Sequence, residues 1–273
     1  MDEPTRLLGR YLDQLGVERD EPSGRLLTAL HAAHAQRYAH DTVWIARGRL
    51  PRLDAVSMAT ALVTGEGGGC LQLNGGFAWL LARLGFQVEL RQAMVQRAFE
   101  RAPAGRPDAH IALVVTVEDS QWYADVGLGN GPLHPLPLAE GSYPQPPFTF
   151  AMEAPSGPDE GWRFLHDPSM LAVRSARLAP AASQLEDWAE VYRIDTTDPA
   201  SDFVRVLSAI RRTTDGVSMM MGRSLITLSA SGRKLRRITA QDEWVDIARG
   251  VFGLGLPGLT TDDLTRLWAR TGS

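Results

Sequence analysis

Cys70 is the one cysteine of the 273-residue sequence, and it stands where a thiol can be reactive. It follows the glycine-rich segment 65–69 and opens a stretch in which Leu73, Phe77 and Leu80 recur at helical spacing. The N-terminus of a helix offers a positive dipole end and unpaired backbone N–H groups, which favour the thiolate. A free cysteine is otherwise often a small buried side chain without chemistry. The position makes Cys70 a candidate nucleophile.

A cysteine nucleophile needs a base and a group that orients the base, and His110 and Asp125 are the best candidates. His110 opens an apolar strand predicted for 110–117, and Asp125 lies in the next predicted strand, 122–129. A carboxylate within an apolar strand is costly unless it is paired. The two residues therefore form a candidate pair.

Whether the pair can form depends on the turn between the two strands. A hairpin centred between Val117 and Glu118 places His110 and Asp125 directly opposite, with Cβ atoms about 5 Å apart. A turn centred at 119–120 instead displaces Asp125 by four residues, or about 13 Å. The pairing is thus a hypothesis about strand register.

The other five histidines carry weaker signals. His31 and His34 lie three residues apart on a predicted helix, but no carboxylate or cysteine at ligand spacing completes a site, so no bound metal is expected. We expect His134 and His166 to be solvated, because they lie in turns rich in proline or next to an Asp-Pro pair. His40 is expected to flank a helix end.

The composition narrows the class of protein. A net charge of −4 disfavours a general nucleic-acid binder, and one cysteine excludes an intrachain disulfide. The N-terminus lacks an apolar signal core, and no stretch approaches the roughly 20 apolar residues of a membrane helix. We expect a soluble, cytoplasmic protein. The basic run 233–237 is expected to be a solvated face, with contact to an anionic cofactor as the alternative.

The periodicity of apolar residues predicts an α+β fold. Up to residue 86 it is helical, with helices over 7–15, 26–34, 53–63 and 70–84. From 87 it becomes strand-like, with strands at 88–99, 110–117, 122–129, 162–165, 171–174 and 190–194. The segment 131–158 is rich in proline and glycine and is expected to be a surface excursion. Beyond an ambiguous stretch, 203–212, we predict a hairpin of 224–229 with 234–238 and two terminal helices. This order indicates separate helical and β layers and not a doubly wound sheet.

Two segments resemble the arylamine N-acetyltransferase family. Gly67-Gly68-Gly69-Cys70-Leu71-Gln72-Leu73-Asn74 is similar to the family's Arg-Gly-Gly-x-Cys-x-Glu-x-Asn. Tyr123-Ala124-Asp125-Val126-Gly127-Leu128-Gly129 is similar to its Asp-Val-Gly-Phe-Gly strand. The order Cys, His, Asp fits as well, and the resemblance is specific from about 65 to 138.

The resemblance implies a fold and an activity. The fold would be a helical bundle (1–86), a β-barrel (87–190) and an α/β lid (191–273), with a cysteine-protease-like, transglutaminase-like Cys-His-Asp core. The activity would be ping-pong transfer of an acyl group, acetyl by default, from acetyl-CoA or another thioester to an arylamine. Cys70 would be the nucleophile, His110 would hold the thiolate and assist the amine, and Asp125 would fix the imidazole. No tightly bound cofactor is implied.

The sequence also departs from the family pattern. Glu66 replaces the arginine before the glycines, Gln72 replaces the glutamate, and the segment 40–43 replaces Pro-Phe-Glu-Asn. Three alternatives therefore stay open. They are an amide synthase that uses a larger acyl donor, including an acyl carrier protein, a catalytically silent ligand-binding homologue, and a cysteine hydrolase.

Overall fold

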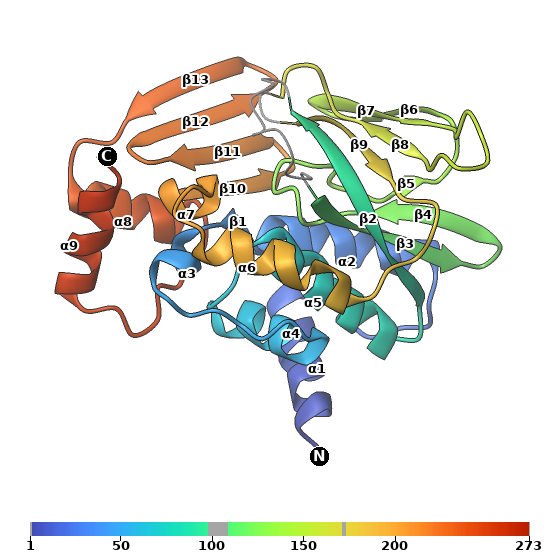
Figure 1. Cartoon of the computed structure of the whole chain (residues 1–273), viewed down its shortest axis with the longest axis horizontal. Coiled ribbons are helices and arrows are strands. Elements are labelled where there is room, and N and C mark those ends of the chain that lie inside the picture. The colour runs from blue at the N-terminus through green and yellow to red at the C-terminus, as the bar shows by residue number, and fades with distance from the viewer. Residues whose placement is uncertain (1, 98–108, 171–172, 273) are drawn as a thin grey trace.

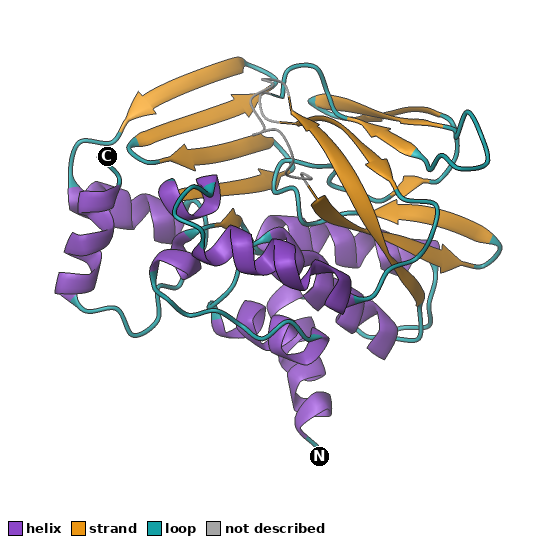
Figure 2. Cartoon of the chain, in the orientation of Figure 1, coloured by secondary structure: helices purple, strands orange, loops and turns teal. Residues whose placement is uncertain are grey.

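The computed structural model describes residues 2–97, 109–170 and 173–272, which form helices and two antiparallel sheets (Figure 1). In the view of Figure 2 most of the helices lie below the two sheets. The separate layers confirm the predicted α+β class. Within the described ranges, no helix has both the length and the apolar character needed to cross a membrane.

The N-terminal helices follow the predicted spacing. Helix α1 (Glu3–Leu15) begins where the side chain of Asp2 accepts a hydrogen bond from the Thr5 N–H, and it ends at Gly16 with φ 64°. The others in this part of the chain are α2 (Gly24–Arg37), α3 (Val43–Ala46), α4 (Ala55–Thr64) and α5 (Cys70–Arg83). Helix α5 thus begins at the predicted residue.

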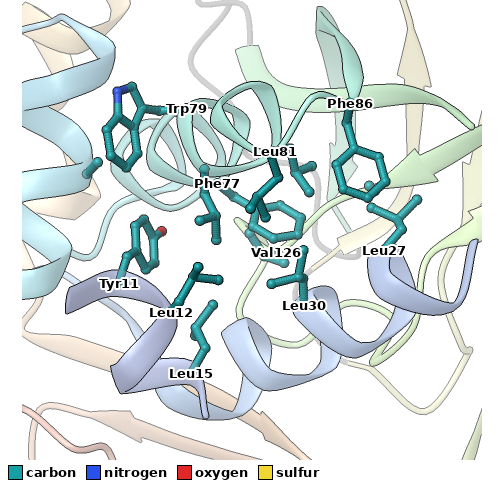
Figure 3. Packing of buried hydrophobic residues seen from close by; sticks show 14 of the residues in the cluster. Tyr11, Leu12, Leu15, Leu27, Leu30, Phe77, Trp79, Leu81, Phe86 and Val126 are labelled. Carbon is teal, nitrogen blue, oxygen red and sulfur yellow. The ribbon is translucent and has the colours of Figure 1, made fainter. Parts of the chain in front are cut away.

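One apolar core holds these helices together and fixes α5. Figure 3 shows Tyr11 of α1 and Leu30 of α2 in the same cluster as Phe77 and Leu81 of α5. Val126, from the β-rich part of the chain, packs into this cluster too. Each fully buried side chain of this size contributes about 1.5–3 kcal/mol. The start of α5 is therefore anchored by the packing of its later turns.

The larger sheet has eight strands in the order β5-β4-β3-β2-β9-β8-β7-β6. Its strands are β2 (Gln87–Arg97), β3 (Ala109–Val117), β4 (Ser120–Ala124), β5 (Leu136–Pro137), β6 (Gly141–Gln145), β7 (Phe148–Glu153), β8 (Arg163–Leu165) and β9 (Val173–Leu178). The strand predicted for 122–129 ends early, at Ala124. Residues 98, 99, 171 and 172 of two other predicted strands lie outside the described residues.

This sheet is nearly closed, like a barrel. Gln145, at the end of edge strand β6, accepts hydrogen bonds from the N–H groups of Leu133 and His134, just before edge strand β5. The prediction that 131–158 is a surface excursion is wrong, because β5, β6 and β7 lie there. Phe148, Phe150 and other alternate residues of β7 point into the barrel core, as a strand with one buried face requires.

The smaller sheet has the order β1-β10-β11-β12-β13. It contains β1 (His40–Asp41), β10 (Ser208–Thr213), β11 (Gly216–Met221), β12 (Ser224–Ser229) and β13 (Gly232–Arg237). The predicted hairpin of 224–229 is confirmed, and all six residues of β13 are exposed, as expected for a solvated basic face. Strand β1 was not predicted. It pairs His40 with Ile210, which lies far along the chain.

Five short helices complete the C-terminal part. They are the 3-10 helix η1 (Leu185–Trp188), α6 (Ala189–Thr197), α7 (Asp202–Arg205), α8 (Gln241–Gly250) and α9 (Thr261–Arg270). The strand predicted for 190–194 is wrong, because these residues belong to α6. Tyr192 of α6 donates from its hydroxyl to the carbonyl of Pro51 at 2.6 Å, which ties this helix to the N-terminal part. The division into parts at 86 and 190 stays a prediction.

Candidate active site

Cys70 occupies the first position of α5, and its side chain is partly exposed. Gly69 precedes the helix without a side-chain cap, so the first N–H groups of α5 have no partner from a capping side chain. The preceding loop is held by β1, where the Asp41 N–H donates to the carbonyl of Gly68 at 2.9 Å. The thiol therefore sits at a helix N-terminus that is fixed from both sides.

The structure brings His110 and Asp125 together. Nε2 of His110 donates to Oδ2 of Asp125 at 2.7 Å, and both side chains are buried. The hairpin is centred between Glu118 and Asp119, midway between the two registers considered from the sequence. Val117 pairs with Ser120 across a turn of Glu118 and Asp119, so Asp125 lies diagonal to His110 and not opposite it.

The diagonal pair can bond because Asp125 lies just beyond β4. The strand ends at Ala124, and Val126, the residue after Asp125, packs into the helical core (Figure 3). The chain leaves the ladder at this point, so Asp125 is not held at the spacing of regular strand pairing. The burial of Val126 fixes the position of the carboxylate beside it.

Four hydrogen bonds hold the carboxylate of Asp125. Oδ2 accepts from His110 and from the hydroxyl of Tyr123 at 2.6 Å, and Oδ1 accepts from Nδ2 of Asn74 at 2.8 Å and from the Gly127 N–H at 2.9 Å. Burial alone would raise the pKa of Asp125, but the charge of His110 and these bonds outweigh it and hold that pKa at about 2. The carboxylate is ionised at neutral pH.

The electrostatics of His110 complement this arrangement. Burial acts to lower the pKa of His110, but the charge and hydrogen bond of Asp125, with a further hydrogen bond to the Cys70 thiol, raise it to about 10. The imidazole thus contacts the sulfur on one side and the carboxylate on the other. These are the contacts that a cysteine nucleophile with an oriented base requires.

Asn74 and Tyr123 were not named as site residues from the sequence, although the spacing of each from a site residue indicated that it lies on the same face. Asn74 lies four residues after Cys70, on the same face of a helix, and Tyr123 lies two residues before Asp125, on the same face of a strand. Oδ1 of Asn74 also accepts from the Val126 N–H at 3.0 Å, and its Nδ2 donates to the carbonyl of Ile111. Asn74 therefore connects α5, β3 and the segment after β4.

The remaining histidines form no hydrogen bond with the side chains of Cys70, His110 or Asp125 within the described residues. Nδ1 of His31 bonds to the carbonyl of Leu133 and Nε2 of His34 to the hydroxyl of Tyr11, so the two rings do not face a common ligand. Among the described residues, no group of three or more potential metal ligands occurs. The prediction that His166 is solvated is wrong, since it is 6% exposed.

The prediction for His40 is also wrong. It lies in β1 and is buried, not at a helix end. Burial, and then the nearby charge of His110, lower the pKa of His40 to about 4. A neutral imidazole thus lies near the charged one.

A cavity that is open to solvent lies beside Cys70. Its walls include three aromatic side chains, Trp44, Tyr192 and Phe203. The rings of Trp44 and Tyr192 are nearly parallel, at 12°, with centroids 6.3 Å apart. A flat, apolar molecule is the kind of ligand that such walls suit.

The departures from the family pattern have clear places in the structure. Glu66 forms an ion pair with Arg49 at 3.0 Å on the surface. The buried amide of Gln72 donates from Nε2 to the hydroxyl of Tyr192 at 3.4 Å. Glu66 thus lies away from the cavity walls, whereas Gln72 and Asp41 are part of them.

Comparison with known proteins gives a consistent result. A family model described as N-acetyltransferase matches residues 24–260. An arylamine N-acetyltransferase of Mycolicibacterium smegmatis is 25% identical over 94% of this chain and 95% of its own length. The arylamine N-acetyltransferase / N-hydroxyarylamine O-acetyltransferase of Salmonella typhimurium is 34% identical, over 44% of this chain; the match spans 41% of that relative.

A solved structure supports the same assignment. The arylamine N-acetyltransferase of Mycobacterium marinum in complex with CoA superposes with a TM-score of 0.84 at 25% identity, covering 97% of this chain and 98% of its own. The family model spans most of the chain, and the fold matches over nearly its whole length. The chain belongs to the arylamine N-acetyltransferase family.

Proposed function

We propose that this protein transfers an acetyl group from acetyl-CoA to an arylamine through an acyl-enzyme on Cys70. The observation that carries the proposal is the contact series Cys70–His110–Asp125 at the N-terminus of α5. The relatives are named arylamine N-acetyltransferases, and the Mycobacterium marinum structure was solved with CoA. Acetyl-CoA and an aromatic amine are therefore the first substrates to test.

In the first half-reaction, the sulfur of Cys70 attacks the thioester carbonyl carbon. A new C–S bond forms, the bond between the acetyl carbon and the CoA sulfur breaks, and CoA leaves with a proton from His110. The imidazole is then neutral beside the acetylated Cys70. Asp125 keeps the ring in the orientation and tautomer that this exchange needs.

In the second half-reaction, the amine nitrogen attacks the acetyl carbon. His110 takes the proton that the nitrogen loses, the C–S bond to Cys70 breaks, and the amide leaves. The thiolate and imidazolium pair is restored, and it is the state that the raised pKa of His110 favours.

The carbonyl oxygen becomes negative in both half-reactions. The N–H groups in the first turn of α5 lie at the nucleophile, and in helix geometry they have no intrahelical acceptor. They also sit at the positive end of the dipole of a 14-residue helix. We assign these groups to the stabilisation of the oxyanion.

The cavity beside Cys70 is suited to the acceptor. Its aromatic walls can take a planar ring, and the amine on that ring would then reach the acetylated sulfur. Of the methionines of β11, Met219 and Met220 are buried in the packed cores and Met221 is 44% exposed. No observation favours a larger donor over acetyl-CoA.

The test is acylation of Cys70 followed by intact mass spectrometry. The protein is mixed with acetyl-CoA, with longer acyl-CoA thioesters and with an acyl carrier protein thioester, each without amine. The proposal predicts one acetyl adduct that an arylamine removes as its N-acetyl product. Cys70→Ala should abolish the adduct, and because the chain has one cysteine no second thiol can confuse the result.

The alternatives predict different outcomes. Acylation by the longer or carrier-bound thioesters alone would indicate an amide synthase. An adduct that water clears faster than any amine would indicate a hydrolase. A protein that forms no adduct with any thioester would be a silent homologue, and the proposal would fail.

A further inference from the structure

The charged residues among the described walls of the Cys70 cavity are negative. Asp41 and Asp195 are among the described residues that line it, and none of these is lysine, arginine or histidine. The other walls are mainly aromatic and aliphatic. The charged side chains among these lining residues are therefore both carboxylates.

Asp41 is held in one position by its backbone and one carboxylate oxygen. Its N–H bonds to the Gly68 carbonyl, and Oδ1 accepts from the Val43 N–H at 2.8 Å. The second oxygen, Oδ2, lies against Gly68, where an added Cβ would come within 2.0 Å of it. The carboxylate is thus fixed against Gly68, which stands two residues before the nucleophile.

Oδ1 bonds to the Val43 N–H at the start of α3, and within the described ranges Oδ2 forms no ion pair and no hydrogen bond with another side chain. The charge of Arg47 acts to lower the pKa of Asp41, but its effect is smaller than that of burial and of the backbone bonds from Val43 and Trp44. Burial raises the pKa of Asp41 to about 7. A cation in the cavity would stabilise the ionised form, whereas a second carboxylate would destabilise it.

We propose that Asp41 is a specificity-determining residue of the acceptor pocket. It selects amines whose ring carries a cationic, hydrogen-bond-donating group, and it disfavours amines whose ring carries a carboxylate. The inference rests on the proposed function, since it concerns the acceptor of the same reaction. It goes further by stating the charge of that acceptor.

Three acceptors of the same shape test the charge preference. They are para-aminobenzamidine, para-aminobenzamide and para-aminobenzoate, whose substituents are positive, neutral and negative. Rates are measured with acetyl-CoA about one pH unit above the Asp41 pKa, where the carboxylate is ionised. The quantity compared is the ratio of kcat/KM for the amidine to kcat/KM for the benzoate.

Asp41→Asn removes the charge and keeps an oxygen that can accept from the Val43 N–H. We expect it to lower the amidine-to-benzoate ratio by about tenfold, because a hydrogen bond to a charged group is worth that much or more. The amide, which is neutral, should change least. Comparing ratios between proteins cancels the different nucleophilicities of the three amines.

Glu66→Gln is the matched control. It removes a carboxylate four residues before Cys70, but one that pairs with Arg49 and does not line the cavity. The amidine-to-benzoate ratio of Glu66→Gln should equal that of the wild type.

The inference is overturned if Asp41→Asn leaves the ratio within twofold of the wild type, or if Glu66→Gln lowers the ratio as much. Either result would limit Asp41 to a structural role through its bonds to Gly68 and Val43. Failure of the proposed function looks different, because the wild type would then form no acetyl adduct on Cys70 and give no ratio to compare.

Discussion

Asn74 and Asp125 are 51 residues apart in sequence and are joined by a hydrogen bond of 2.8 Å from Nδ2 to Oδ1. The bond connects the helix that carries Cys70 to the segment that carries the carboxylate. Because Asn74 also bonds to the backbone of Ile111 and Val126, it fixes both neighbours of the His110–Asp125 pair. The relative positions of nucleophile and base thus depend on one buried amide.

Replacing Asn74 with alanine should cost both stability and acylation rate. The substitution leaves the Val126 N–H and the Ile111 carbonyl without partners in a buried place. Each such group costs about 1–3 kcal/mol. Urea unfolding measures the loss, and single-turnover acylation of Cys70 by acetyl-CoA measures the rate.

Gln36→Ala provides the control for this substitution. Gln36 is a partly exposed amide on α2 that donates to the Ala32 carbonyl, and its loss should change the free energy of unfolding by less than about 0.5 kcal/mol. An Asn74→Ala protein as stable and as fast as Gln36→Ala would show that the amide is dispensable.

Asp125→Asn should lower the pKa of His110 from about 10 to below 6.5. The charge of Asp125 is what offsets the effect of burial, and without it burial favours the neutral ring. Loss of a triad carboxylate in this way costs about 10⁴-fold in rate. The pKa is read from NMR titration of the imidazole, and the rate from acylation of Cys70.

Tyr123→Phe separates the charge of Asp125 from its hydrogen-bond partners. This variant removes one of the four bonds to the carboxylate and leaves the ion pair in place. It should move the His110 pKa far less than Asp125→Asn does. Equal shifts in the two variants would contradict an electrostatic origin.

Gly68→Ala should destabilise the loop before Cys70. A Cβ at this position would lie 2.0 Å from Oδ2 of Asp41 and 3.0 Å from the Ala39 carbonyl, so β1 has to move. Overpacking of this kind costs about 1–3 kcal/mol. Thermal unfolding measures the cost.

Gly9→Ala is the control for Gly68→Ala, because the added methyl group meets no neighbouring atom. Gly9 lies inside α1 with nothing within 4 Å of an added Cβ, so alanine should stabilise the protein by about 0.5–1 kcal/mol. The two substitutions are chemically identical and should have opposite signs. The same sign for both would show that Gly68 is not closely packed.

The helical core and the residues of the candidate site could be predicted because the sequence patterns that indicate them each lie within a short segment. Cys70 stands at the junction of a glycine-rich loop and a strongly periodic helix, and His110 opens an apolar strand. The register of the pair stayed open because the turn between β3 and β4 lacks the Asn-Gly or Asp-Gly signal, and Glu118 adopts φ 53°, which is unusual for its type. The pair was therefore identified, but not its position across the two strands.

Other elements depend on contacts that a single sequence does not reveal. Strand β6 contains Pro144, and such a strand is tolerated only at an edge, which the local sequence cannot indicate. The stretch 190–194 is too short for its periodicity to separate helix from strand, and Tyr192 ties it to Pro51 as a helix. The pairing of β1 with β10 joins residues about 170 positions apart.

The buried histidines should make the protein less stable as the pH falls. Burial lowers the pKa of His31, His40 and His166 to about 4 and that of His34 well below 6.5. Between pH 6.5 and about 4 the unfolded chain binds protons that the folded protein does not. Stability present above pH 6.5 is therefore lost toward pH 4, by about 1.4 kcal/mol per pH unit for each histidine.

The other perturbed groups do not reverse this trend. His110 is charged in both states below pH 6.5, and its contribution is lost only as the pH rises through about 10. The contribution of Asp125 is complete above 3.8 and is lost as the pH falls through about 2. Asp41, with its pKa raised to about 7, keeps its proton in the folded state and offsets one histidine.

Urea unfolding at about pH 7, 6 and 5 measures the slope, and His31→Asn tests its origin. Asparagine can donate to the Leu133 carbonyl as Nδ1 of His31 does, but it does not titrate. The slope of this variant should be smaller than that of the wild type by about 1.4 kcal/mol per pH unit, whereas His134→Asn, at a half-buried position, should change it less. Because the two substitutions remove the same ionisable group, parallel slopes for wild type and His31→Asn would mean that burial of His31 does not contribute to the loss of stability in acid.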